Sequence, residues 1–100
     1  MNCRVIFREA ARDEAVEAAL YIAGRGSAES AARWYEGLVE ALDSLRRMPE
    51  RCGFARENDC FSVELRQLVY KSHRIIFTVR EKTVHVLHGR HAAIDELEQL

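Results

Sequence analysis

The stretch ELRQLVYKSHRIIFTVREKTVHVLHGRH, residues 64–91, decides the fold. Apolar residues alternate in it with arginine, histidine and other polar residues, and two short polar connections divide it into three parts. Alternation with a period of two places successive side chains on opposite faces of a sheet. The pattern predicts strands at residues 62–69, 73–80 and 83–88, which should pair antiparallel because the connections between them are short.

The middle predicted strand has two unlike faces. One face is wholly apolar and the other carries an arginine; the two sets are Ile75, Phe77 and Val79, and Arg74, Ile76 and Thr78. We therefore expect one face of the sheet to be buried and the other to expose arginine. An exposed face of that kind would suit an anionic partner.

A short strand and a first helix are predicted upstream of this stretch. Residues 3–8 alternate as a strand does. Residues 10–23 are rich in alanine and glutamate, which favour helix. Gly24 and Gly26 follow this segment and should end the helix.

A second helix should begin after Ser27, whose side chain can cap its first turn. We expect this helix to run to about Met48, because Pro49, the only proline of the chain, follows there. Its apolar stripe comprises Ala31, Trp34, Leu38, Ala41 or Leu42, and Leu45.

The predicted fold is therefore α+β, with the order β-α-α-β-β-β and a helical hairpin packed on one face of a mainly antiparallel, curved sheet. Between the second helix and the next strand we expect a polar loop, and residues 92–100 should add a short helical turn. The predicted core packs the helices against the sheet; it comprises Ile22, Trp34, Leu38, Leu45, Phe7, Ile75, Phe77 and Val86.

We interpret the 100 residues as one domain spanning positions 1–100. The formal net charge is −1 and the pI about 6.4, but the charge is unevenly distributed. Residues 46–91 hold ten Lys and Arg against five Asp and Glu, whereas residues 1–45 and 92–100 are both acidic. This distribution predicts a bipolar molecule with one positive patch. The near-neutral pI counts against nonspecific binding of nucleic acid.

Cellular location is predicted from the start of the chain and from the cysteines. Charged residues interrupt the first ten positions, where a secretory signal would need an apolar run, and no stretch of 18 apolar residues exists. The three cysteines are an odd number without close spacing, so we expect reduced thiols. The sequence thus predicts a cytoplasmic protein that makes no contact with a membrane.

Several segments in this order resemble the RelE/ParE superfamily of toxins from type II toxin–antitoxin systems. They are AARDEAVEAALYIA, SAESAARWYEGLVEALDSLRRMP, ELRQL, HRIIFTV and VHVLHGRH, and they cover almost the whole chain. The HRIIF and VLHGRH segments are most similar to the ParE and plasmid-stabilisation members.

The resemblance implies a small toxin that inhibits growth and is neutralised by a tightly bound cognate antitoxin in a hetero-oligomer. Two kinds of target are known in the superfamily. RelE-like members cleave messenger RNA in the ribosomal A site without a metal ion, whereas ParE-like members block DNA gyrase and cut nothing themselves. No cofactor is implied for either kind.

Arg66 and Arg74 are the first candidate site residues. Guanidinium groups form bidentate bonds with phosphate and stay charged at cellular pH. In a nuclease they would stabilise charge on the scissile phosphate, and in a binding toxin they would contact an acidic target or the antitoxin. The alternative is a structural ion pair with a local acid such as Glu64 or Glu57.

His88, Arg90 and His91 are the candidates for proton transfer, because histidine titrates near neutral pH. The RelE-like nucleases often carry a tyrosine near the C-terminus, whereas this chain has none after Tyr70. That difference weakens the nuclease interpretation. His88 equally suits a structural role at the end of a strand, with its ring hydrogen-bonded to backbone.

A metal site has little support in the sequence. His85 and His88 are three residues apart, so on a regular strand they would point to opposite faces. Cys52 and Cys60 lack the close pair that zinc sites usually show. We therefore predict no metal and no cofactor.

Three functions remain open at this point. A ParE-like toxin would inhibit DNA gyrase or a similar target by binding alone. A RelE-like toxin would be a ribosome-dependent, metal-independent endoribonuclease that uses Arg66, Arg74, His88, Arg90 and His91. A decayed module would bind its antitoxin and inhibit nothing. The near-neutral pI and the missing C-terminal tyrosine favour the first function.

Overall fold

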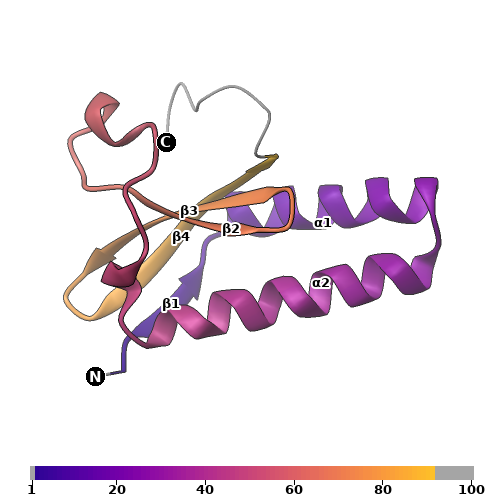
Figure 1. Ribbon diagram of the computed structural model, residues 1–100, viewed down its shortest axis with the longest axis horizontal. Helices are drawn as coiled ribbons and strands as arrows, with labels where there is room; N and C mark the ends of the chain where they lie inside the picture. The colour runs from indigo at the N-terminus through magenta and orange to yellow at the C-terminus, as the bar shows by residue number, and fades with distance from the viewer. Residues whose placement is uncertain (1, 92–100) are drawn as a thin grey trace.

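The computed structural model describes residues 2–91, and of His91 only the backbone, so the helical turn expected in residues 92–100 lies outside it. Strand β1 and two helices are followed by three strands, as predicted (Figure 1). Their bounds are β1 Arg4–Phe7, α1 Glu9–Arg25, α2 Ala28–Asp43, β2 Arg66–Tyr70, β3 His73–Arg80 and β4 Thr83–His91. The α+β fold with a helical pair packed on the sheet is confirmed.

The four strands form one mixed sheet in the order β1-β4-β3-β2. The last three strands pair antiparallel through two tight turns, whereas β1 pairs parallel with β4. A parallel pair needs a long crossover, and the helical hairpin is part of it. The two helices lie side by side and extend beyond one end of the sheet (Figure 1).

Helix α2 begins with a capping box. The Ser27 hydroxyl accepts a hydrogen bond from the Ser30 amide at 3.1 Å, and the Ser30 hydroxyl accepts one from the Ser27 amide at 3.1 Å. The helix ends at Asp43 rather than at the predicted Met48. A 3₁₀ turn, Ser44–Arg46, follows instead and brings Leu45 into the core. A 3₁₀ turn keeps the i, i+3 spacing from Leu42 to Leu45, which is why the sequence pattern looked continuous.

The helices cover one face of the sheet, and the predicted core is confirmed. Trp34, Leu38 and Leu45 are buried together with Ile75, Phe77 and Val86, while Phe7 and Ile22 pack at the margin of this core. Tyr70 ties β2 to α2, because its hydroxyl donates to the Trp34 carbonyl at 3.0 Å. Gly37 makes this approach possible, since a Cβ there would lie 2.2 Å from the Tyr70 oxygen.

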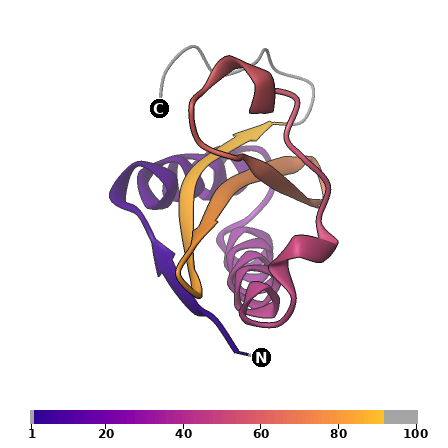
Figure 2. The same ribbon diagram turned by 90° about the vertical axis from the view of Figure 1, so that its left-hand side faces the viewer.

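The other face of the sheet is partly covered by residues 52–65, for which the sequence predicts a polar loop followed by the first residues of a strand. This segment wraps from the end of α2 around the sheet (Figure 2). It buries a second, smaller core comprising Ala55, Leu65 and Ile76, with Phe61, Val63 and Leu87 packed against it. Strand β2 therefore begins at Arg66 and not at residue 62, because the residues before it fold over the sheet.

An irregularity in β4 changes the faces of its C-terminal half. Phe77 pairs with Val86 but Ile76 pairs with His88, so Leu87 is an extra residue opposite β3. Consequently His88 lies on the same face as His85, and the expectation that the two histidines point to opposite faces is wrong. A single inserted residue moves the side chain of every later residue in the strand to the opposite face of the sheet.

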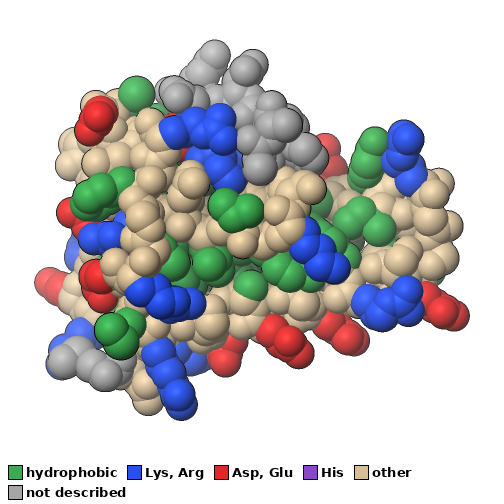
Figure 3. Space-filling model, in the orientation of Figure 1, with side chains coloured by type: hydrophobic (Ala, Val, Ile, Leu, Met, Phe, Trp, Pro, Cys, Tyr) green, Lys and Arg blue, Asp and Glu red, His purple; other side chains and the backbone are tan. Residues whose placement is uncertain are grey.

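In Figure 3, acidic side chains line the edge formed by α2, whereas most basic side chains lie over the sheet and its connections, in several separate groups and not in the one patch that the sequence predicts. Among the described residues no helix is long and apolar enough to cross a membrane.

Candidate functional site

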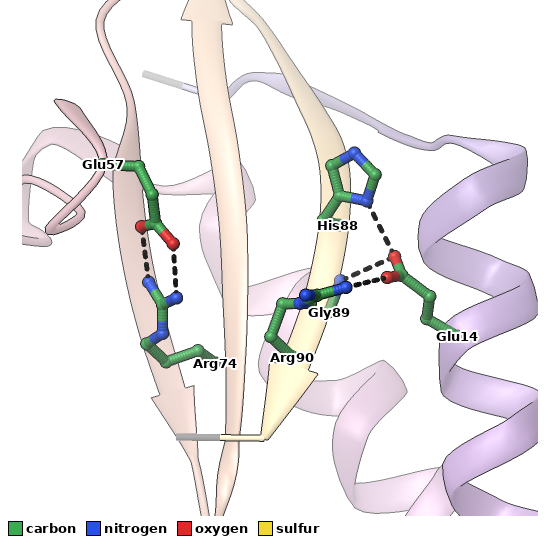
Figure 4. Close-up of polar contacts among 6 residues, drawn as sticks. All are labelled: Glu14, Glu57, Arg74, His88, Gly89 and Arg90. Carbon is green, nitrogen blue, oxygen red and sulfur yellow. Dashed lines mark hydrogen bonds and ion pairs between the residues drawn. The ribbon is translucent and has the colours of Figure 1, made fainter. Parts of the chain in front are cut away.

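Arg74 and Glu57 form a buried, bidentate ion pair. The two Arg74 terminal nitrogens donate to the two Glu57 carboxylate oxygens at 2.8 and 2.6 Å (Figure 4). Their side chains are 1% and 0% exposed. Gln67 on β2 accepts a further bond from Arg74 at 2.9 Å. The expectation that this face presents Arg74 to solvent is therefore wrong, because the 52–65 segment covers it and supplies its counter-ion.

This pair contributes more to conformation than to net stability. Removing two charges from water costs nearly as much as their attraction returns, so a buried pair is worth little against an apolar pair. Removal of one partner alone costs much more free energy, since the remaining charge would be buried without a counter-ion. The Arg74 Nε already lacks a hydrogen-bond partner among the described residues. We infer that the pair fixes the 52–65 segment to the sheet.

Glu14 of α1 organises a second polar cluster at the outer edge of β4. Its carboxylate accepts bonds from His88 Nδ1 at 2.9 Å and from the Gly89 amide at 3.2 Å, and lies 3.6 Å from the Arg90 guanidinium (Figure 4). Strand β1 pairs with β4 only as far as Val86. Beyond that point the edge of β4 has no neighbouring strand, and Glu14 satisfies one of its exposed amides.

A groove adjoins this cluster between α1, α2 and the β2–β3 turn. Its volume is about 880 Å³. Its walls combine aromatic and aliphatic residues with charged ones; they are Glu14, Glu17, Ala18, Tyr21, Ile22, Trp34, Lys71, Ser72, His73, Gly89 and Arg90. In Figure 3, hydrophobic side chains are visible along the middle of the molecule, between the sheet and α2.

His73 and Trp34 form the floor of the groove. Their rings meet edge to face with centroids 5.3 Å apart, and His73 is buried. Gly89 on the neighbouring strand leaves room for the imidazole, because a Cβ at position 89 would lie 2.2 Å from its Nε2. Any side chain at position 89 would therefore displace His73 and alter the groove.

Arg66 lies on the helix-facing side of the sheet and not beside Arg74. It pairs across the strands with Phe77, whereas Arg74 projects from the opposite face. Its guanidinium donates to the carbonyls of Glu50 and Cys52 at 3.2 and 2.6 Å, and to Glu64 at 3.3 Å. These bonds hold the connection after α2 against the start of β2, so Arg66 has a local structural role.

The thiols and histidines offer no metal centre among the described residues, where no three potential ligands lie close enough together. Cys3 and Cys52 are buried and Cys60 is exposed; none of the three is in a disulfide. Burial raises the pKa of the Cys52 thiol, although Arg51 and Arg66 partly oppose this effect. A thiol with a raised pKa is a poor nucleophile and a poor metal ligand.

Comparison with known proteins agrees with this architecture. A solved structure of a chromosomal ParDE TA system from P. aeruginosa superposes with a TM-score of 0.75 at 15% sequence identity, covering 89% of this chain and 95% of that one. At this identity the likeness concerns the fold alone. None of the curated proteins matches. A family model described as the ParE toxin of the type II toxin–antitoxin system parDE matches residues 5–96. The chain belongs to the ParE toxin family.

In this ParE-type toxin, three of the five site residues predicted from sequence come together. Arg74 and Arg90 are cross-strand neighbours, and His88 lies two pairs along, opposite Ile76 and on the same face. Arg66 is on the other face. The His91 backbone pairs with His73, and its side chain lies outside the described residues.

Two residues of the site were not identified from the sequence of this ParE-type toxin. Glu14 sits in an alanine-rich helix that carries several other glutamates, so nothing in its context distinguishes it. His73 is the first residue of β3, and nothing in its sequence context shows that its ring is buried against Trp34. The one usable signal for His73 was Gly89, because glycine inside a strand often marks a close approach of another group.

Proposed function

We propose that this ParE-type toxin inhibits growth by binding DNA gyrase or a similar large target, without cutting it, and that a cognate antitoxin neutralises it. The burial of Arg74 carries the proposal. The arginine best placed on β3 to hold a phosphate is enclosed and bound at both terminal nitrogens by Glu57 and Gln67. A guanidinium so engaged has no terminal nitrogen facing solvent with which to bind a substrate.

The ribonuclease alternative requires phosphate ligands and a proton donor around one point. Arg66 lies on the opposite face from Arg74, so the two cannot hold one phosphate between them. His88 donates its Nδ1 proton to Glu14, and Arg90 pairs with the same carboxylate. These contacts connect α1 to the edge of β4, which is a sufficient structural role for both residues.

The groove between α1, α2 and the β2–β3 turn is the proposed antitoxin site. An amphipathic helix can place apolar residues on Trp34, Tyr21 and Ile22. Lys71 and Arg90 on the strand side would pair with acidic residues of such a segment. Tyr21 is 63% exposed, which suits an aromatic anchor that becomes covered only in the complex.

Two assays with the purified toxin test the target. In a supercoiling reaction with DNA gyrase, we expect the toxin to stop the reaction, and added antitoxin to restore it. In a translation reaction with mapped messenger ends, we expect no codon-specific cleavage. Cleavage in the A site, together with unaffected supercoiling, would refute the proposal and favour the ribonuclease. Inactivity in both assays, with intact antitoxin binding, would refute it in favour of a decayed module.

A matched pair of variants tests the antitoxin site. Tyr21→Ala should weaken antitoxin binding by about 2 kcal/mol or more, roughly 30-fold in Kd, because a buried aromatic anchor carries much of the energy of an interface. Val39→Ala removes a comparably exposed apolar side chain on α2 that does not line the groove. It should leave the Kd within about twofold. Equal effects of the two variants, measured by calorimetry, would place the antitoxin elsewhere.

A further inference from the structure

The 52–65 segment leaves part of its side of the sheet uncovered. Its small core reaches as far as Leu87. Beyond Leu87, toward the β3–β4 turn, Arg4 and Arg80 are exposed, and Thr83 and His85 are half-buried. In Figure 2 this turn and β1 lie at the bottom of the sheet, away from the covering segment at the top. We refer to this surface as the β1–β4 face.

Three arginines lie on the β1–β4 face: Arg4 in β1, Arg80 at the end of β3, and Arg8 in the connection between β1 and α1. Val5 and Phe7 pack toward the helices, so by alternation Arg4 points to the opposite side. Arg4 and Arg80 both pair with Thr83, from the two strands that flank β4. At the usual strand spacing their backbones are about 10 Å apart.

Arg8, just after β1, completes the set. Its Nη2 donates to His85 Nδ1 at 3.0 Å, which places its guanidinium beside His85, two positions along β4 from Thr83. Burial lowers the pKa of His85, and the charges of Arg8, Arg80 and Arg4 lower it further. All three guanidinium groups therefore lie within electrostatic range of one imidazole.

These arginines have no counter-ions among the described residues, in whose ion pairs none of the three takes part. The adjoining turn adds Glu81 and Lys82, whose charges cancel. Like charges held together on a surface cost free energy, which an anion would recover. The contrast with Arg74 is direct, since Arg74 has its carboxylate and these three have none.

We propose that the β1–β4 face binds the phosphodiester backbone of a nucleic acid. Guanidinium forks match phosphate oxygens, and the Thr83 hydroxyl between Arg4 and Arg80 supplies a further donor. The arginines are spread across β1, the connection after it and β3, so a ligand that contacts all three carries charges repeated along its length.

A nucleic acid fits this face better than an acidic peptide does. Binding sites for protein segments depend on apolar or aromatic anchors. The face offers only Ile6, half-buried, and its sheet positions contain no phenylalanine, tyrosine or tryptophan; they are Arg4, Ile6, Thr78, Arg80, Thr83 and His85. Without aromatic rings it cannot stack bases, so it should contact the backbone irrespective of sequence. The near-neutral pI reflects the acidic helices and conceals this local charge.

The test is a salt titration of binding, using the full chain and labelled oligonucleotides of random sequence. A 24-base-pair DNA duplex and a 24-nucleotide single-stranded RNA serve as the two probes. Three phosphate contacts on duplex DNA predict a slope of about −2.7 for log K against log salt concentration. Arg4→Ala/Arg80→Ala should reduce the slope to about −0.9. Arg25→Ala/Arg33→Ala, which removes two exposed charges on the helices, should leave it unchanged.

Binding of either probe with its expected slope, about −2.7 for the duplex or about −2.1 for the single-stranded RNA, supports the proposal, and the tighter of the two identifies the natural source. Failure of both probes to bind at low salt would overturn the proposal. An equal reduction of the slope in the two double variants would also overturn it. A poly-glutamate peptide that binds through Arg4 and Arg80 while neither nucleic acid does would also overturn it. Thermal melting checks that both double variants are folded. The antitoxin-binding test with Tyr21→Ala is independent of these outcomes, because the groove is lined by none of the residues of the β1–β4 face.

Discussion

The two faces of the sheet bury their side chains through different interactions. The helix side buries apolar residues that come from regular elements with regular spacing, such as Leu38 and Phe77. The other side combines a small apolar cluster with a fully buried ion pair, Arg74 and Glu57, and is covered by an irregular segment. The free energy gained by burying apolar side chains grows with the buried area and tolerates small errors of packing. A buried charge, in contrast, is stable only when its partner is in place. The second face therefore specifies one conformation of the 52–65 segment.

The largest expected effects come from the helix side. Phe77→Ala should lower the free energy of unfolding by about 3–5 kcal/mol, because the ring is fully buried and its loss leaves a cavity. Chemical denaturation monitored by the single tryptophan, Trp34, measures this directly. A loss below about 1 kcal/mol would show that the helix side does not hold the fold together.

An effect of similar size is expected where the ion pair is broken. Glu57→Ala should cost about 3–5 kcal/mol, since Arg74 would remain charged and buried without a counter-ion. Glu64→Ala is the matched control: this glutamate pairs with Arg66 but is 62% exposed, so its loss should cost less than about 1 kcal/mol. Equal losses in urea denaturation would contradict the contrast between the buried and the exposed pair.

A smaller effect is expected at the start of α2. Ser27→Ala removes one half of the capping box and should cost about 1 kcal/mol. Ser27→Gly should cost only a few tenths of a kcal/mol, because glycine exposes the helix end to water. If the two variants melt at the same temperature, the serine hydroxyl does not cap the helix.

The smallest effect concerns pH. His85 has a lowered pKa in the folded protein because of burial and the nearby Arg8, Arg80 and Arg4. The unfolded chain then binds more protons than the folded chain between the two pKa values, so stability should fall as the pH falls through about 6.5. His85→Asn should flatten this part of the stability profile. A wild-type protein that gains stability on acidification over this range would contradict the prediction.

Regular spacing explains what the sequence could predict. The strands, the helical hairpin and the core around Trp34 and Phe77 all follow from periods of two or 3.6 residues. The end of α2 was misplaced because a 3₁₀ turn keeps Leu45 in phase with Leu42. The faces of β4 were misassigned because the extra residue Leu87 has no signature in the alternation.

The site was less predictable because its partners come from distant parts of the chain. Arg74 was identified by residue type, and Glu57 was named as one possible partner, but spacing cannot show that residues 52–65 cover the sheet. Glu14 reaches His88 across 74 positions of sequence. Such contacts depend on where α1 crosses the edge of β4, which is a property of the packed fold.

The most direct test of this account replaces the buried ion pair by apolar residues of similar size. Arg74→Met/Glu57→Leu should fold and bind antitoxin, because apolar replacement of a buried pair is often neutral or stabilising. If Arg74 is structural, the double variant should still arrest growth when induced without antitoxin. Loss of growth arrest in a variant that melts like the wild type and binds antitoxin equally well would contradict the account and assign Arg74 to the toxic activity itself.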